Sequence, residues 1–189
     1  MTSNSLRASR ATRTAIGSSF IVPAAAQSAK PLARSSARWD GKGRWADEGP
    51  DNDLRYMPMG LLSLYGVPFR VIDPATNGGC SCVILRAGLG PGTRTDRDEY
   101  PRSVSISVGH RTNAFYFLLG VGWGIEGPVA TLTVHYADDH KFVPARKDRF
   151  RYAVQWVNPR SGVPVQSLEF TGAGRTPIPI LLSVTGHGT

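Results

Sequence analysis

Short apolar runs separated by glycine- and proline-containing turns recur from residue 60 to the end of the chain, and this rhythm restricts the fold more than any other feature. Apolar residues alternate with Ser or Thr at 104–108 and 131–136, which is typical of a strand with one buried face. Continuous apolar runs at 82–85 and 114–119 fit strands buried on both faces. No stretch has a convincing helical period. The pattern predicts an all-β fold, an antiparallel β-sandwich of the jelly-roll type.

The expected strands are 61–65, 67–72, 82–85, 104–108, 114–119, 131–136, 141–143, 152–157, 165–170 and 178–184. Ala137-Asp138-Asp139-His140 is expected to form a hairpin turn between two of them, because Asp is favoured in turns. The run at 114–119 belongs in the centre of a sheet. In the last strand, Ile178, Ile180, Leu182 and Val184 are expected to share one inward face.

Charge divides the chain into two parts. The 189 residues carry a formal net charge of +8, and six basic residues lie within 1–38, which contains no Asp or Glu. The remaining 16 basic and 14 acidic residues leave +2 on residues 39–189 (16 − 14 = +2). We therefore expect a basic, Ser- and Ala-rich arm at 1–38 and one β-sandwich domain at 39–189. A nucleic-acid partner is not expected for the sandwich, because the positive charge is not spread over it.

The arm has three interpretations. It could be a secretory signal, with Ala15–Val22 as a short apolar region and a small-residue cleavage site near Ala26. It could be an organellar transit peptide, which has the same Arg-rich, acid-poor composition. It could also be a retained arm whose arginines contact phosphates or an acidic protein surface. The arginines that would make these contacts are Arg7, Arg10, Arg13, Arg34 and Arg38.

Several functional classes find little support in the sequence. Gly122–Gly127 matches the GxGxxG dinucleotide fingerprint, but Pro128 and a β-rich segment follow where the fingerprint requires a helix. The four histidines lack the spacing of metal ligands, and no nucleophile motif accompanies them. No run approaches eighteen apolar residues, so no transmembrane helix is expected. We expect a protein without catalytic residues and without an organic cofactor.

An acidic cluster precedes the first expected strand. Asp47, Asp51 and Asp53 are crowded together with turn-forming residues, and carboxylates on a loop are ligands that calcium prefers. A local cluster is a poor glycosidase site, because the two catalytic carboxylates must face each other across a sugar. The cluster therefore predicts either a structural calcium site or side chains that cap turns and bond the backbone.

Aromatic side chains supply candidate platforms for a sugar ring. Trp45 and Trp123 lie among turn residues, whereas Trp156 is expected to pack in the core. His135 is expected to face solvent or a groove, because its neighbours on that face are threonines. Together with Tyr136, these residues form the predicted carbohydrate-binding set: Trp45, Trp123, His135 and Tyr136.

Two motifs carry a family resemblance over residues 39–186. WADEGPDNDLRYMPMG and GVPFRVIDPATNGGCSCVIL resemble the WxDxGPxNDLxxxPxG and GVPFxIIDPxxNxGxSCIVL patterns of galactose-binding-like β-sandwich modules in bacterial secreted and envelope proteins. Such modules are often fused to glycoside hydrolases. The resemblance implies a non-catalytic module that is periplasmic or secreted and is associated with carbohydrate or the cell envelope. The alternative is a structural accessory subunit of a larger protein assembly, docked by the sandwich and its basic arm.

Overall fold

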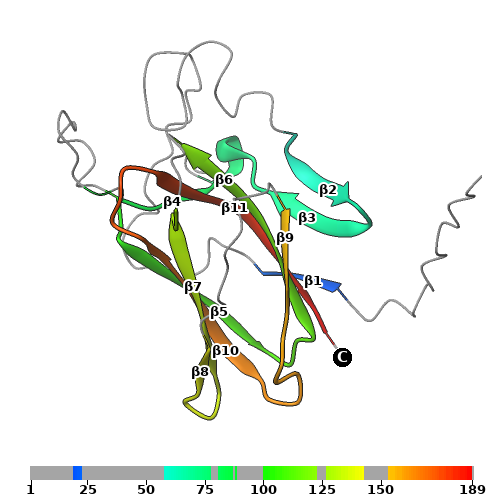
Figure 1. Ribbon diagram of the computed structural model, residues 1–189. Helices are drawn as coiled ribbons and strands as arrows, with labels where there is room; N and C mark the ends of the chain where they lie inside the picture. The colour runs from blue at the N-terminus through cyan, green and yellow to red at the C-terminus, as the bar shows by residue number, and fades with distance from the viewer. Residues whose placement is uncertain are drawn as a thin grey trace, which may run out of the picture.

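The structure, a computed structural model, describes residues 19–22, 58–77, 81–86, 88, 100–122, 127–142 and 153–188, the first of these ranges by its backbone alone. Two antiparallel sheets pack face to face (Figure 1). The first sheet has the order β1 (Ser19–Val22), β11 (Ile178–His187), β6 (Ala114–Gly122) and β9 (Ala153–Val157), and β4 (Val83–Ile84) also pairs with β11. The second sheet has the order β5 (Ser103–His110), β10 (Val165–Gly172), β7 (Ala130–Tyr136) and β8 (Lys141–Phe142).

The pairing of these strands is nested. β4 pairs with β11, β5 with β10, β6 with β9 and β7 with β8, all antiparallel. The chain from β4 to β7 thus lies against the chain from β8 to β11 as one long hairpin that wraps into the two sheets, four of its strands in each, and β1 is the fifth strand of the first sheet. This arrangement is the jelly roll, so the predicted fold class is confirmed.

The positions of the strands follow the hydrophobic pattern closely. Each of the ten expected segments overlaps an observed strand, and the turn at 137–140 joins β7 to β8 as expected. β6 lies between β11 and β9, in the interior of its sheet. The described residues also contain a short 3-10 helix, Pro74–Thr76, and no helix among them is long and apolar enough to cross a membrane.

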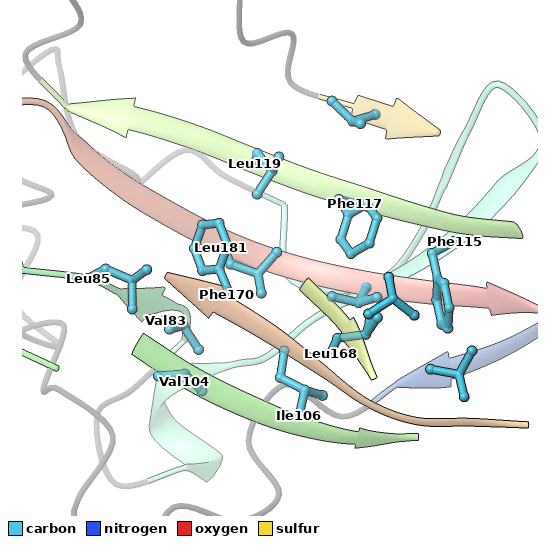
Figure 2. Close-up of a cluster of buried hydrophobic side chains, with 14 of the residues drawn as sticks. Val83, Leu85, Val104, Ile106, Phe115, Phe117, Leu119, Leu168, Phe170 and Leu181 are labelled. Atoms are coloured by element: carbon cyan, nitrogen blue, oxygen red, sulfur yellow. The ribbon is translucent and has the colours of Figure 1, made fainter. Parts of the chain in front are cut away.

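The main core lies between the two sheets (Figure 2). Phe115 and Phe117 from β6 face Leu168 and Phe170 from β10 across this space. Tyr136, Val165, Leu168 and Val184 have no exposed surface. We call this set the first cluster: Val83, Leu85, Val104, Ile106, Phe115, Phe117, Leu119, Val134, Tyr136, Val154, Val165, Leu168, Phe170, Leu181 and Val184.

β11 does not have the single inward face that the sequence predicted. Nearly all of its residues are buried, because the strand has packing partners on both sides of the sheet. Its register with β6 shifts between Leu181 and Ser183, and such a bulge changes which side chains point to which face. Val184 therefore joins the first cluster, whereas Ile180 and Leu182 belong to a second one.

The second cluster lies on the other face of this sheet, under a hairpin of β2 (Gly60–Leu64) and β3 (Val67–Val71) (Figure 1). Its buried members are Phe69, Val71, Cys82, Ile84, Leu118, Ile178, Ile180 and Leu182. Side chains of β11 also hold the edge of β3 in place: Ser183 Oγ accepts from the Arg70 N–H at 3.2 Å, and the Thr185 hydroxyl donates to the Pro68 carbonyl at 2.5 Å. The hairpin is thus a third layer attached to the sandwich.

β1 adds a strand from within the segment that was expected to be an arm. Ser19–Val22 pairs antiparallel with Val184–His187 along the same edge of β11 that β4 occupies at Ile180 and Leu181. Four residues cannot form a core of their own, but an open sheet edge offers them backbone hydrogen bonds. The other residues of the predicted arm lie outside the described part of the chain.

Candidate carbohydrate-binding face

The outer face of the second sheet is a regular grid of polar side chains. Its three rows across β5, β10 and β7 are Ser103, Thr171 and Thr131; then Ser105, Glu169 and Thr133; then Ser107, Ser167 and His135. All nine residues are partly or fully exposed. We call these nine residues the Ser/Thr face.

The alternation of each strand places these residues outside. Val104 and Ile106 on β5, Leu168 and Phe170 on β10, and Val134 on β7 point into the first cluster. Because successive side chains of a strand point to opposite faces, the residues between them must face outward. The grid therefore has the spacing of the sheet itself, about 4.8 Å between strands and about 6.8 Å between alternate residues of one strand.

Glu169 and His135 form an ion pair or hydrogen bond within the grid. His135 Nε2 lies 3.1 Å from Glu169 Oε2, with side-chain exposures of 22% and 38%. The two residues are diagonal neighbours on paired strands, a distance that long side chains span. The contact fixes the carboxylate in the middle of the hydroxyl groups, where one of its oxygens can accept further hydrogen bonds.

The chemistry of this face is chiefly hydrogen bonding, because its largest apolar groups are threonine methyls and one imidazole ring. Ser and Thr hydroxyls donate and accept, and an ionised carboxylate accepts only. The face holds a single carboxylate, whereas glycoside hydrolysis ordinarily uses a pair. The arrangement is thus suited to holding a polyhydroxylated ligand rather than to cleaving it.

Tyr136 lies on the opposite side of β7 from His135 and is completely buried. Its hydroxyl donates to Asn158 Oδ1 at 2.5 Å, and Arg160 lies over its ring at 4.7 Å. A ring in this position has no exposed face for a sugar, so Tyr136 is removed from the predicted carbohydrate-binding set. Burial raises the pKa of the Tyr136 hydroxyl, although the positive charge of Arg160 opposes the shift.

Asn158 connects the loops at this end of the sandwich. Its Nδ2 donates to the Thr112 carbonyl at 2.7 Å, and its Oδ1 also accepts from the Arg160 N–H at 2.9 Å. Arg160 in turn makes a two-point contact with Asp138, at 2.6 and 3.2 Å. The hydrogen bond from Arg160 lowers the pKa of Asp138, and the same bond raises the pKa of Arg160. Because its hydroxyl bonds Asn158 and Arg160 lies over its ring, Tyr136 has a structural role.

The other predicted site residues fall outside the described part of the chain. These are Trp45 and Trp123 of the carbohydrate set, Asp47, Asp51 and Asp53 of the calcium site, and Arg7, Arg10, Arg13, Arg34 and Arg38 of the arm. The described residues contain no group of three or more metal-ligating side chains. Of the predicted carbohydrate set, His135 is the residue placed on an exposed polar surface.

One aromatic residue is buried as the sequence predicted, and another is exposed at a place that the sequence analysis did not single out. Trp156 stacks on Phe115 with ring centroids 6.0 Å apart and packs against the first cluster, as predicted. Tyr65 is fully exposed at the tip of the β2–β3 hairpin and was not in the predicted set. Glu169 was also missed, because the sequence does not reveal that β10 lies between β5 and β7.

No family, no curated protein and no solved structure matches this chain in the comparisons made with each. The topology and the site therefore define the class of protein directly. It is an antiparallel β-sandwich with jelly-roll strand order, an additional hairpin layer and a polar grid on one outer face.

Proposed function

We propose that this protein is a non-catalytic β-sandwich module that binds carbohydrate, and that its ligand lies on the Ser/Thr face. The observation that carries the proposal is the three-by-three grid of seven hydroxyl side chains around Glu169 and His135. A sugar ring presents several hydroxyl groups on a nearly flat outline. A flat grid of alternating donors and acceptors is complementary to such a ligand.

The composition of the face favours carbohydrate over a protein partner. The centre of a protein interface is enriched in aromatic and other large apolar residues. The Ser/Thr face contains no Phe, Tyr or Trp and no large aliphatic side chain. Binding through hydrogen bonds on an open surface is weak per site, since each bond replaces one to water and contributes about 0.5–1.5 kcal/mol.

The resemblance of residues 39–186 to galactose-binding-like modules supports the same conclusion. Modules of that kind accompany carbohydrate-active proteins of the bacterial envelope and exterior. We therefore place the protein in the periplasm or outside the cell, in contact with envelope or extracellular glycans. In this proposal the position of the ligand differs from the aromatic platform expected from the sequence.

A glycan array with the purified full-length chain tests the proposal. We expect at least one reproducible ligand, and Glu169→Ala should weaken binding by about tenfold or more, because hydrogen bonds to charged groups contribute about 1.5–3 kcal/mol. Gln155→Ala is the matched control. Gln155 is an exposed polar residue on β9 of the other sheet, where its amide donates to the Tyr116 hydroxyl.

Trp123→Ala separates the two possible locations of the ligand. Loss of binding in Trp123→Ala with full binding in Glu169→Ala would move the site from the Ser/Thr face to the loops. An array without any ligand would refute the carbohydrate function itself. The melting temperature of each variant is measured as well, so that lost binding is not confused with lost folding.

A further inference from the structure

Exposed apolar side chains concentrate on one strand. The described residues include four exposed large hydrophobic side chains, and three of them are Met59, Leu61 and Tyr65 on or beside β2. Leu61 is 68% exposed, and Tyr65 is fully exposed. Leu61 alternates with Leu62 and Leu64 along the strand and therefore points outward, whereas Met59 precedes Gly60 at φ 84° and Tyr65 lies in the hairpin turn. Leu62 and Leu64 occupy the opposite side and pack against the second cluster.

β2 is also the outermost strand of its hairpin. Among the described residues it pairs with β3 alone. The Pro68 carbonyl and the Arg70 N–H bond to side chains of β11, so these two residues point their backbone groups away from β2. Their partners in the register, Ser63 and Leu61, must then point their own backbone groups away from β3, toward the free edge.

This edge lacks the features that protect exposed strands. Natural edge strands usually carry a charge, a proline or a bulge that prevents pairing with another chain. Gly60–Leu64, with the sequence GLLSL, contains no charge and no proline, and its register with β3 runs without interruption. The edge is therefore competent to accept another strand.

Tyr65 adds an independent observation. It occupies the left-handed region at φ 53°, and Gly66 follows at φ 80°, which makes a two-residue hairpin turn between Leu64 and Val67. Such turns favour Asn, Asp or Gly at the first position, because a side chain with a Cβ is strained there. A fully exposed Tyr contributes nothing to the fold in return for this strain. Strained residues that the fold does not need are candidates for function.

We propose that β2 pairs antiparallel with β2 of a second copy of this chain, about a two-fold axis at Leu62. In this register Leu61 lies opposite Ser63 of the second copy, and the outward backbone groups of both residues are satisfied. Met59 and Tyr65 flank the strand, and this register brings the Met59 end of one copy to the Tyr65 end of the other, where a contact between sulfur and an aromatic ring is favourable.

Self-complementarity is the reason for choosing a second copy over another protein. A two-fold interface requires that each residue and its partner exchange roles across the axis. The register about Leu62 pairs the two residues with free backbone groups, Leu61 and Ser63, with each other across the axis, whereas an axis at either of them would leave the other without a partner in β2. The proposal is independent of the carbohydrate function, because the hairpin packs on the first sheet and the Ser/Thr face belongs to the second.

Sedimentation equilibrium of the full-length chain measures the association. We expect a dimer in reversible equilibrium, and Leu61→Lys should raise its dissociation constant by roughly tenfold or more, because a lysine on an edge strand opposes pairing. Tyr65→Asn should weaken the dimer and yet raise the melting temperature of the monomer. These opposite signs would not arise if Tyr65 served the fold alone.

A cysteine scan tests the register. Leu62→Cys places two thiols opposite each other at the axis, where residues of a non-hydrogen-bonded pair have Cα atoms about 4.5 Å apart, within reach of a disulfide. It should form a covalent dimer under mild oxidation. Leu64→Cys, on the same face and similarly half-buried, should not, because its own copy lies four residues away along the strand. A monomer at all concentrations, or equal crosslinking of both variants, would overturn the proposal.

Discussion

The two faces of the β1-β11-β6-β9 sheet are covered in different ways. One face packs against a whole second sheet and forms the first cluster, and the other packs against the two-stranded β2–β3 hairpin and forms the second cluster. The strands of the sandwich are interlocked by nested pairing, whereas the hairpin is attached by side chains and by two hydroxyl hydrogen bonds. We infer that the sandwich unfolds as a unit and that the hairpin can open separately.

Truncation of one phenylalanine on each side tests this difference most strongly. Phe115→Ala and Phe69→Ala each remove a buried ring, so each should cost about 3–5 kcal/mol. Phe115→Ala should lower the global free energy of unfolding by that amount, measured in urea. Phe69→Ala should increase amide exchange chiefly in Gly60–Val71, with a smaller effect on the global transition. If both variants affect all strands alike, the hairpin belongs to the same cooperative unit.

The loops at one end of the sandwich depend on a single amide. Asn158→Ala removes the acceptor of the Tyr136 hydroxyl and the donor to the Thr112 carbonyl. Each buried group left without a partner costs about 1–3 kcal/mol, so we expect a loss of about 2–4 kcal/mol in a urea titration. Asn113→Ala is the control, because Asn113 Nδ2 bonds the Gly188 carbonyl at 3.3 Å and is less buried. An equal loss of unfolding free energy in both variants would show that the buried bonds of Asn158 contribute no more than the single bond of Asn113.

The sequence predicted the strands better than it predicted their faces. Alternation located β5 and β7 correctly, because each has one dry and one wet side. It failed for β11, where a bulge changes which residues face inward, and a bulge depends on the neighbouring strand. Ser19–Val22 was missed as a strand for a related reason, since its hydrogen bonds come from a sheet edge more than 150 residues later in the chain.

The candidate site could be predicted in part. His135 was expected on a wet face and lies there. Tyr136 could have been excluded from the same surface, because adjacent residues of a strand point to opposite faces and Tyr136 continues the dry positions of Leu132 and Val134. Glu169 could not have been found, since its place in the grid depends on the order β5-β10-β7.

Weakening the attachment of the hairpin should have a smaller effect on stability. Thr185→Val keeps the shape of the side chain and removes its hydrogen bond to the Pro68 carbonyl. We expect opening of Gly60–Val71 to become easier by about 1–2 kcal/mol, with the free energy of global unfolding changed less. Native-state hydrogen exchange of the hairpin amides measures the opening. Thr112→Val, which alters a buried threonine whose hydroxyl donates to the His110 carbonyl and not to the hairpin, should leave these amides unaffected.

The contact between Asp138 and Arg160 should give the smallest effect, and it should depend on pH. In the folded state the hydrogen bond from Arg160 holds the pKa of Asp138 below its ordinary value of about 3.9. A carboxyl group with a lowered folded-state pKa contributes stability above the ordinary value, and this contribution is lost as the pH falls through the folded-state pKa. Asp138→Asn should therefore lower the melting temperature slightly at pH 7 and not at all in strong acid.

The melting temperatures of the wild-type chain and of Asp138→Asn are measured from pH 7 to pH 2. The difference between them should shrink to zero as the pH falls. Asp139→Asn is the matched control, because Asp139 is exposed in the same turn and Arg160 forms its ion pair with Asp138 instead. The contact joins the β7–β8 turn to the β9–β10 loop, and neither residue belongs to the hairpin or to the second cluster, so hairpin exchange at Gly60–Val71 should stay the same in Asp138→Asn. Faster exchange in the hairpin would show that the two faces of the first sheet are energetically coupled. It would contradict the inference that the hairpin opens separately from the sandwich.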